Sequence, residues 1–170
     1  MTGLRDKAAL VTGGSRGIGR AIVQRLAADG AAVVFSYHAN EGAAADVVAS
    51  VHAAGGTVHA LQADLGDPGA AVRLYARAEE LLGPLDILVN NAGAVAGDPI
   101  ADTSDEVFDA TFAVNVKSPF VLMREAARRL RDGGRVINIS TLNTVMVGPR
   151  MAPYASSKAA LELLGRVAAY

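Results

Sequence analysis

The sequence predicts an α/β protein built on a doubly wound parallel sheet, with a single domain over residues 1–170. Short runs rich in β-formers alternate along the chain with longer stretches whose apolar residues recur at helical spacing. Glycine or proline separates most of these segments, as expected at turns. Strands that alternate with helices favour right-handed crossovers, which place the strands parallel to one another in one sheet.

Five segments are expected to form strands, because each is short, apolar and bounded by turn residues. They are residues 8–12, 32–36, 57–62, 86–90 and 135–140. The fourth of these runs is apolar through its middle, which is typical of a strand covered by helices on both faces. The sheet is therefore expected to lie between two layers of helices.

The stretches between these strands are expected to form helices. They are residues 16–28, 41–54, 67–82, 104–114 and 116–131, followed by a last helix from about Tyr154. Gly30 is placed to end the first helix as a C-terminal cap. Asp67 is expected to cap the third helix, with Pro68 in its first turn.

Charge and composition exclude several classes of function. The formal net charge is -1, so no electrostatic feature favours nucleic acid or an anionic membrane surface as a partner. The chain has no Cys and its three His lack the spacing of metal ligands, so we expect no disulfide and no metal site. No run approaches the roughly 18 apolar residues of a membrane-spanning helix, and the polar amino terminus does not resemble a signal peptide. We therefore expect a cytoplasmic protein.

A glycine-rich loop joins the first expected strand to the first helix. Residues 12–19 read Thr-Gly-Gly-Ser-Arg-Gly-Ile-Gly. Small residues at this junction let the backbone approach a pyrophosphate, whose charge is favoured by the N–H groups and the dipole of the following helix. The spacing Gly-x-x-x-Gly-x-Gly differs from the commoner Gly-x-Gly-x-x-Gly motif of dinucleotide-binding proteins. The alternative is a tight turn that only allows close packing of helix and strand.

Tyr154 and Lys158 lie four residues apart on the last expected helix, so their side chains share one face. A tyrosine phenol is a weak acid at neutral pH, and a nearby ammonium favours its ionised form. Such a pair can give a proton to a carbonyl oxygen or take one from an alcohol. The alternative is a tyrosine at a helix start beside a solvated lysine.

Together these motifs resemble those of the short-chain dehydrogenase/reductase family, whose sheet is of the Rossmann type. The loop Thr-Gly-x-x-x-Gly-Ile-Gly is similar to the family's cofactor motif, and further features agree with it in order and interval. They are Asn90-Asn91-Ala92-Gly93, Asn115, the hydroxyl pair Ser140-Thr141, and Tyr154-x-x-x-Lys158. The resemblance covers the whole chain and represents the first two-thirds of a family member. It implies an oxidoreductase that transfers a hydride between NADP(H) and a carbonyl or alcohol substrate, similar to 3-oxoacyl-type reductases.

The resemblance also implies catalytic roles. Tyr154 is the acid-base, Lys158 assists its ionisation and grips the ribose, and Asn115 supports a proton relay through water. The family places a Ser thirteen residues before the Tyr, and this position holds Thr141 here. Thr carries the same hydroxyl, although its extra methyl group restricts χ1. We expect Thr141 to position the substrate oxygen, with Ser140 as the alternative.

The expected cofactor is NADP, with NAD as the less favoured choice. NAD-selective sheets of this kind carry an acidic residue after the second strand, and none occurs between Ser36 and Asn40. Arg16 can pair with a 2′-phosphate, and Ser36 and His38 can add hydrogen bonds. The alternative for Arg16 is a solvated residue at a helix start. The expected cofactor-binding residues are Gly13, Ser15, Arg16, Gly17, Ile18, Gly19, Ser36, His38, Asp64, Leu65, Asn91, Ala92, Gly93, Tyr154 and Lys158.

The loop after the fifth expected strand is mostly apolar, which favours a hydrophobic or acyl-type carbonyl substrate. Its apolar residues are Leu142, Met146, Val147, Pro149 and Met151. A different interpretation of the same motifs is a dinucleotide-binding module without catalysis, or an inactive truncated form.

The chain ends at Tyr170, inside the helix expected from Tyr154. By the resemblance we expect a carboxyl-terminally incomplete domain, which leaves the fifth strand at an open edge of the sheet. The chain is then a fragment, a part completed by another chain, or a truncated form. The last two long helices carry more apolar residues than one sheet contact needs, so we expect a homodimer or homotetramer. The alternative is that both apolar faces only cover the sheet.

Overall fold

The computed structural model describes residues 3–170, so the first two residues of the predicted domain lie outside the described part. Strands and helices alternate as β1 Ala8–Val11, α1 Gly17–Ala28, β2 Ala32–Tyr37, α2 Glu41–Ala53, β3 Thr57–Gln62, α3 Ala70–Leu82, β4 Ile87–Asn90, α4 Asp105–Phe112, α5 Ser118–Arg129, β5 Arg135–Asn138 and α6 Ala152–Ala168. Three short helical turns lie between them, η1 at Ile100–Asp102, η2 at Ala113–Lys117 and η3 at Leu142–Thr144.

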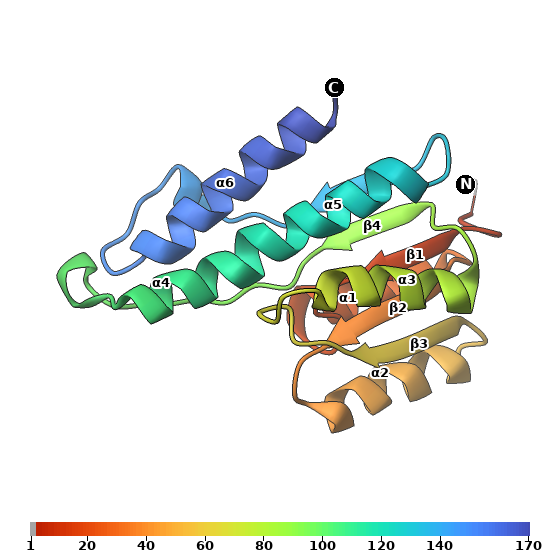
Figure 1. Ribbon diagram of the computed structural model, residues 1–170. Helices are drawn as coiled ribbons and strands as arrows, with labels where there is room; N and C mark the ends of the chain where they lie inside the picture. Colours follow the sequence, from red (N-terminus) through yellow and green to blue (C-terminus); the bar gives the residue numbers. More distant parts are fainter. Residues whose placement is uncertain (1–2) are drawn as a thin grey trace.

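The strands form one parallel sheet in the order β3-β2-β1-β4-β5 (Figure 1). β1 lies at the centre, where Leu10 is in register with Val34 of β2 and with Leu88 of β4. The chain builds outward from β1 to β3 and then crosses to the other side of β1 to form β4. Such a reversal of strand order opens a crevice at the carboxyl ends of the two central strands. The predicted doubly wound α/β class is confirmed.

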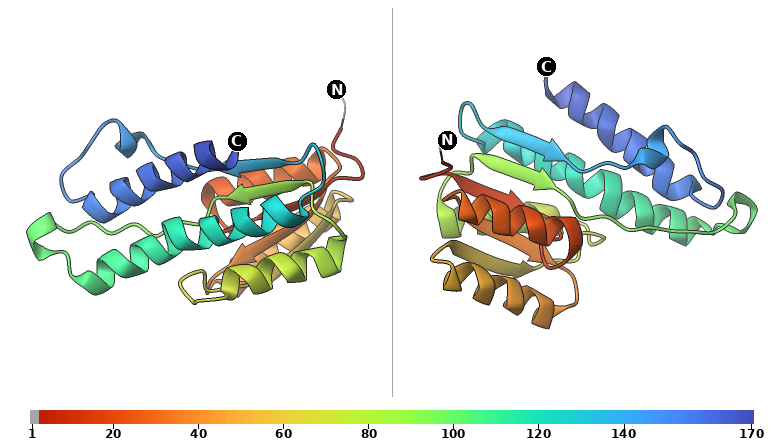
Figure 2. Two further views of the ribbon diagram at one scale, coloured as in Figure 1. Left: turned by 45° about the horizontal axis from the view of Figure 1, so that its top comes forward. Right: turned by 180° about the vertical axis from the view of Figure 1, so that it is seen from behind.

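Successive residues of each strand face two separate hydrophobic cores. Leu10, Val34 and Leu88 point to a core that α3, α5 and α6 cover. Val11 and Phe35 point to the opposite core, which α1 and α2 cover. Figure 2 shows α1 and α2 on the face of the sheet that lies behind α3 and α5 in Figure 1. The sheet is therefore buried on both faces over its central strands, as the apolar runs predict.

The start of α3 differs from the prediction. The helix begins at Ala70, and its N-cap is Gly69 with a left-handed φ of 88°. Asp67 does not cap it, and the Asp67 N–H donates to Asp64 O (3.1 Å) in a turn after β3. Its carboxylate pairs with Arg73 instead. Asp-Pro has the chemistry of a helix start, but here it forms the turn that precedes one.

The helices predicted at residues 104–114 and 116–131 are joined through a π-helical turn, η2, and form one continuous helix. Figure 1 shows α4 and α5 as one long rod with α6 beside it. α6 begins at Ala152, slightly earlier than predicted, with Pro153 in its first turn where the missing proline N–H needs no partner. Tyr154 therefore lies within the first turn of α6.

β5 and β3 are the two edges of the sheet. Val136 and Ile137, on opposite faces of β5, are 40% and 45% exposed, whereas the residues of β4 beside them are buried. Within residues 3–170, no helix combines the length and the apolar character needed to cross a membrane.

Candidate active site

The loop between β1 and α1 depends on glycine both for its backbone conformation and for space. Gly13 and Gly17 have positive φ values of 68° and 54°, which L side chains rarely adopt. A Cβ on Gly14 would lie 2.5 Å from Phe35 Cβ, and a Cβ on Gly19 would lie 2.1 Å from Gly13 O. The loop therefore packs closely against β2 at Gly14 and against the first turn of α1 at Gly13.

Two polar residues join this loop to the segment that follows β4. Thr12 Oγ1 accepts hydrogen bonds from the N–H groups of Asn91 (3.0 Å) and Ala92 (2.9 Å). In return, Asn91 Nδ2 donates to Thr12 O (2.8 Å) and to Gly13 O (3.0 Å). Thr12 is 2% exposed, so these partly buried bonds are shielded from much of the solvent and hold the two loops together.

A cleft of about 640 Å³ opens above this junction, at the carboxyl edge of the sheet. Its lining contains every cofactor residue predicted from the sequence except Tyr154 and Lys158. The prediction missed four further lining residues: Tyr37, Ala63, Ala94 and Val114. They carry no motif signal, because they line the cleft only through their place at the ends of strands and in η2.

The amino terminus of α1 faces the cleft without a side-chain cap, since the N-cap residue Arg16 makes no capping hydrogen bond. The first N–H groups of a helix lack partners inside the helix, and its dipole favours an anion at this end. The neighbouring Ile18 is 63% exposed at the same turn. An uncapped helix end that faces the cleft, after a loop of small residues, fits the pyrophosphate of a dinucleotide.

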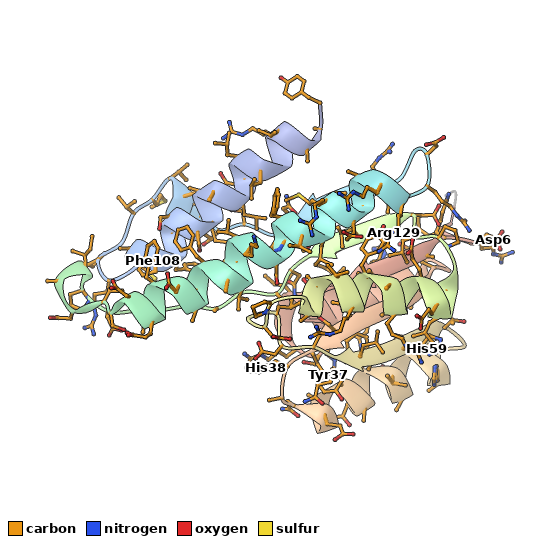
Figure 3. All side chains as sticks on the ribbon, viewed as in Figure 1. Asp6, Tyr37, His38, His59, Phe108 and Arg129 are labelled. Carbon is orange, nitrogen blue, oxygen red and sulfur yellow. The ribbon has the colours of Figure 1, made fainter. Side chains whose placement is uncertain are left out.

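The far end of the cleft lies where β2 and β3 end. Ser36 is buried there, and its Oγ accepts a hydrogen bond from Gly13 N (3.2 Å), so it supports the glycine-rich loop directly. His38 follows β2 and projects at the carboxyl edge of the sheet (Figure 3). Its Nε2 lies 3.7 Å from Asp64 Oδ2, and both side chains are exposed. Arg16 lines the same cleft, so two basic residues and one acid converge on it.

Asn115 lies in the π turn η2 and is fully buried. Its Oδ1 accepts from Ala94 N (2.8 Å), while its Nδ2 donates to Ala94 O (2.8 Å) and to Ser157 Oγ (2.9 Å). Ser157 Oγ in turn donates to Tyr154 O (2.7 Å). Asn115 therefore ties the loop after β4 to the first turns of α6. A π turn at such a place is common near functional sites.

Lys158 is 3% exposed, and its Nζ donates to Ile139 O (2.8 Å) just beyond β5. Burial lowers the pKa of its ammonium group. Gly93 connects it to the cleft, because a Cβ on Gly93 would lie 3.4 Å from Lys158 Nζ and 3.5 Å from Asn115 Oδ1. The lysine and the asparagine thus flank the end of the cleft that Gly93 lines.

The two candidate hydroxyls for the substrate oxygen have different partners. Ser140 Oγ donates to the carboxylate of Glu162 on α6. Thr141 Oγ1 accepts from Asn143 N (3.3 Å), which leaves its own hydrogen to donate. The Ser140 hydroxyl is engaged within the fold, so Thr141 stays the better candidate of the two.

Sequence reasoning missed the roles of Thr12, Ser157 and Glu162. Thr12 opens the glycine-rich loop and Ser157 lies between Tyr154 and Lys158. The motifs do not reveal which residues their hydroxyls bind, because those partners can lie far away along the chain. Glu162 falls at the fourth position after Lys158, where helical spacing places it on the face of Tyr154.

The fold and the cleft define a Rossmann-type protein with a site shaped for a dinucleotide. A model of the short chain dehydrogenase family matches residues 7–170. A short-chain type dehydrogenase/reductase of Picea abies is 42% identical, over 98% of this chain and 65% of that protein. Versicolorin reductase 1 of Aspergillus parasiticus is also 42% identical, over 96% of this chain and 63% of that protein.

A crystal structure of a short chain dehydrogenase from Burkholderia cenocepacia, in complex with NADP, superposes with a TM-score of 0.89 at 47% identity. The match covers 93% of this chain and 65% of that one. The protein belongs to the short-chain dehydrogenase family. The chain spans less than two-thirds of the length of the Picea abies and Aspergillus parasiticus relatives, at 65% and 63%.

The close approach at Gly19 generates a stability prediction. Gly19→Ala places a methyl group against Gly13 O, so we expect the free energy of unfolding to fall by about 1–3 kcal/mol. Gly42→Ala is the matched control, because a Cβ added to Gly42 in α2 would come no closer than 3.7 Å to a neighbouring atom. It should raise stability by about 0.4–1 kcal/mol. Urea denaturation measures both, and equal effects of the two substitutions would contradict the prediction.

Proposed function

We propose that the complete protein is an NADPH-dependent oxidoreductase that reduces a carbonyl group, or oxidises the matching alcohol in the reverse direction. The observation that carries this proposal is the buried Lys158, one helical turn after Tyr154, at the end of the cleft lined by Gly93. A buried amine beside a cleft whose glycine-rich loop can bind a nucleotide is typical of a proton-transfer site.

Different residues of the cleft would bind different parts of the cofactor. The glycine-rich loop and the first turn of α1 would hold the pyrophosphate, and Asp64 with Leu65 would contact the adenine. Arg16 and His38 would meet the 2′-phosphate, since no acid lies between Ser36 and Asn40 to repel it. The NADP in the Burkholderia cenocepacia complex supports this choice of cofactor.

When bound, the nicotinamide would supply a hydride to the carbonyl carbon or accept one from the alcohol carbon in the reverse direction. Tyr154 gives its phenolic proton to the carbonyl oxygen, and in the reverse direction it takes the alcohol proton. Lys158 favours the ionised phenol and grips the ribose, with one of its three N–H donors held by Ile139 O. Thr141 donates to the substrate oxygen, and Asn115 supports the proton relay.

The substrate we propose is a hydrophobic or acyl-type ketone, such as a 3-oxoacyl group. The loop between β5 and α6 carries a row of exposed apolar side chains, which would line the substrate's path. They are Leu142, Val145, Met146 and Val147, all at least 64% exposed. The reductase activity named for the Aspergillus parasiticus relative agrees with the direction of reaction proposed.

Removal of the proposed proton donor tests the reaction. Tyr154→Phe in the complete protein should lower kcat with a carbonyl substrate about 10²- to 10⁴-fold, because the proton is then no longer delivered. NADPH affinity, measured by titration calorimetry, should change little. Val72→Ala is the control and should retain full turnover, since Val72 lies on the exposed side of α3 and does not line the cleft. Turnover of Tyr154→Phe within a few-fold of wild type would refute the assignment, and binding without turnover in the wild type would favour the non-catalytic module.

Removal of Arg16 tests the choice of cofactor. Arg16→Ala should weaken NADPH binding by about 1–3 kcal/mol, because a charge-assisted contact with the 2′-phosphate is lost. NADH binding should be unaffected. Arg20→Ala, one turn further along α1 and outside the cleft, serves as the control. An equal loss for NADPH and NADH would show that Arg16 does not read the 2′-phosphate.

We also propose that the complete protein is a homodimer or homotetramer, with α5 and α6 at a twofold contact. Some of the apolar residues that favour this in the sequence pack against the sheet instead: Val121, Met123 and Ala126 are buried in the core. Others stay exposed, including Phe120 on α5 and Leu163 and Val167 on α6. Phe120 lines a shallow, mainly apolar groove together with Phe112, Ala113, Val116 and Leu164, and Asp109 and Lys117 complete its lining.

An isologous contact through this groove would bury the exposed phenyl ring of Phe120. Light scattering of the complete protein at tens of micromolar should therefore give a dimer or tetramer mass. Phe120→Glu should shift it toward the monomer, while Val72→Glu on the exposed side of α3 should not. A monomeric wild type would refute the proposal.

A further inference from the structure

One face of α6 holds the segment that leads out of β5. Tyr154, Lys158 and Glu162 recur at intervals of four and therefore lie along a single face of the helix. Lys158 Nζ donates to the carbonyl of Ile139, and one turn later the Glu162 carboxylate accepts from the hydroxyl of Ser140. Two successive side chains of this face thus fix two successive residues of the segment.

The Glu162 carboxylate is a strong acceptor. Hydrogen bonds from Ser140 and Thr144, and the charge of Arg166, hold the pKa of Glu162 below its ordinary value. The group is therefore ionised at neutral pH, and hydrogen bonds to an ionised oxygen are shorter and stronger than neutral ones. Glu162 is not part of the hydrophobic core, whose contact from this turn comes from Leu161.

The same carboxylate reaches both ends of the turn η3. Thr144 has two acceptors within reach of its hydroxyl, the Glu162 carboxylate and Thr141 O (3.0 Å). Ser140 precedes the turn and donates to Glu162, and Thr144, which ends the turn, donates to Thr141 O near the same carboxylate. Thr141 therefore lies between the residue that Glu162 binds and a residue beside Glu162. With Ser140 engaged, Thr141 is the member of the pair whose hydroxyl hydrogen stays available.

We propose that Glu162 is a positioning residue, which holds Ser140 and the turn η3 on α6 so that Thr141 alone presents its hydroxyl to the substrate oxygen. The face of α6 that carries the acid-base Tyr154 then also sets the place of the hydroxyl donor. This inference rests on the function proposed above. In this proposal Ser140 acts through its hydrogen bond to Glu162 and does not contact the substrate.

The test compares Ser140→Ala, Glu162→Gln and their double variant in the complete protein with NADPH and a carbonyl substrate. Each single variant should lower kcat about tenfold, since small displacements of a positioned group reduce rates by such factors. The KM for NADPH should stay within about twofold of wild type, because neither residue lines the cofactor cleft. The double variant should be no slower than either single one, because both changes break the same contact.

Two further variants separate positioning from general loss of structure. Ser140→Thr keeps the hydroxyl and should retain most of the turnover, whereas Thr141→Val should lose about a hundredfold or more, as expected for a donor to the reacting oxygen. Glu80→Gln is the matched control, because Glu80 forms an exposed ion pair with Arg77 on α3, remote from α6. It should leave kcat unchanged.

Three results would overturn the proposal: kcat within twofold of wild type for both single variants, multiplied losses in the double variant, or a hundredfold loss in Ser140→Ala with full turnover in Glu162→Gln. The last result would make Ser140 the donor to the substrate. A wild type that binds NADPH without turnover would instead refute the proposed function. Thermal unfolding then tests the contact between Ser140 and Glu162. Equal shifts in Tm for the two single variants and the double variant would support the contact, whereas a double variant whose shift is the sum of the two single shifts would overturn it.

Discussion

The hydrogen-bonded junction between the carboxyl ends of β1 and β4 is the constraint on which the site depends. Thr12 and Asn91 exchange bonds through both backbone and side chain, at a partly buried place that shields them from much of the solvent. The junction exists because the sheet order puts β4 beside β1, so two segments far apart in sequence end at one edge. It holds the glycine-rich loop open on the side that faces the cleft, and it fixes where Ala92 and Gly93 run.

From this junction a chain of buried and partly buried polar contacts leads to α6. Asn91 and Ala92 are held by Thr12, Ala94 is held by Asn115, and Asn115 donates to Ser157 on α6. A partly satisfied polar network inside a protein destabilises it, whereas these groups each find a partner at 2.8–3.0 Å. The position of α6 relative to the glycine-rich loop is therefore set by directional bonds as well as by apolar packing.

The sequence predicts the strands, their alternation with helices in a parallel sheet, and the glycine-rich loop. It does so because apolar runs and glycine spacing are local signals. It misplaces the start of α3, since Asp67 and Pro68 have the chemistry of a helix cap while the left-handed Gly69 delays the helix. It favours Thr141 over Ser140 by spacing alone, because it does not reveal the hydrogen bond from Ser140 to Glu162, which lies more than twenty residues away from Ser140. The π turn at Asn115 is not predictable from local signals either, and the side chain of Asn115 binds Ala94 and Ser157, which lie far from it along the chain.

The burial of the Lys158 ammonium group lowers the stability of the folded protein, so stability alone does not explain a lysine at this position. Its amine is 3% exposed, and burial is the cause that lowers its pKa, with no carboxylate among residues 3–170 offsetting that effect. An ammonium taken out of water destabilises the folded state unless it is paired, and the backbone carbonyl of Ile139 is a weak substitute for a charge. An apolar side chain of similar length would pack at this position of α6 without that penalty. The lysine, with the space kept beside it by Gly93, is best explained by the proton chemistry proposed for Tyr154.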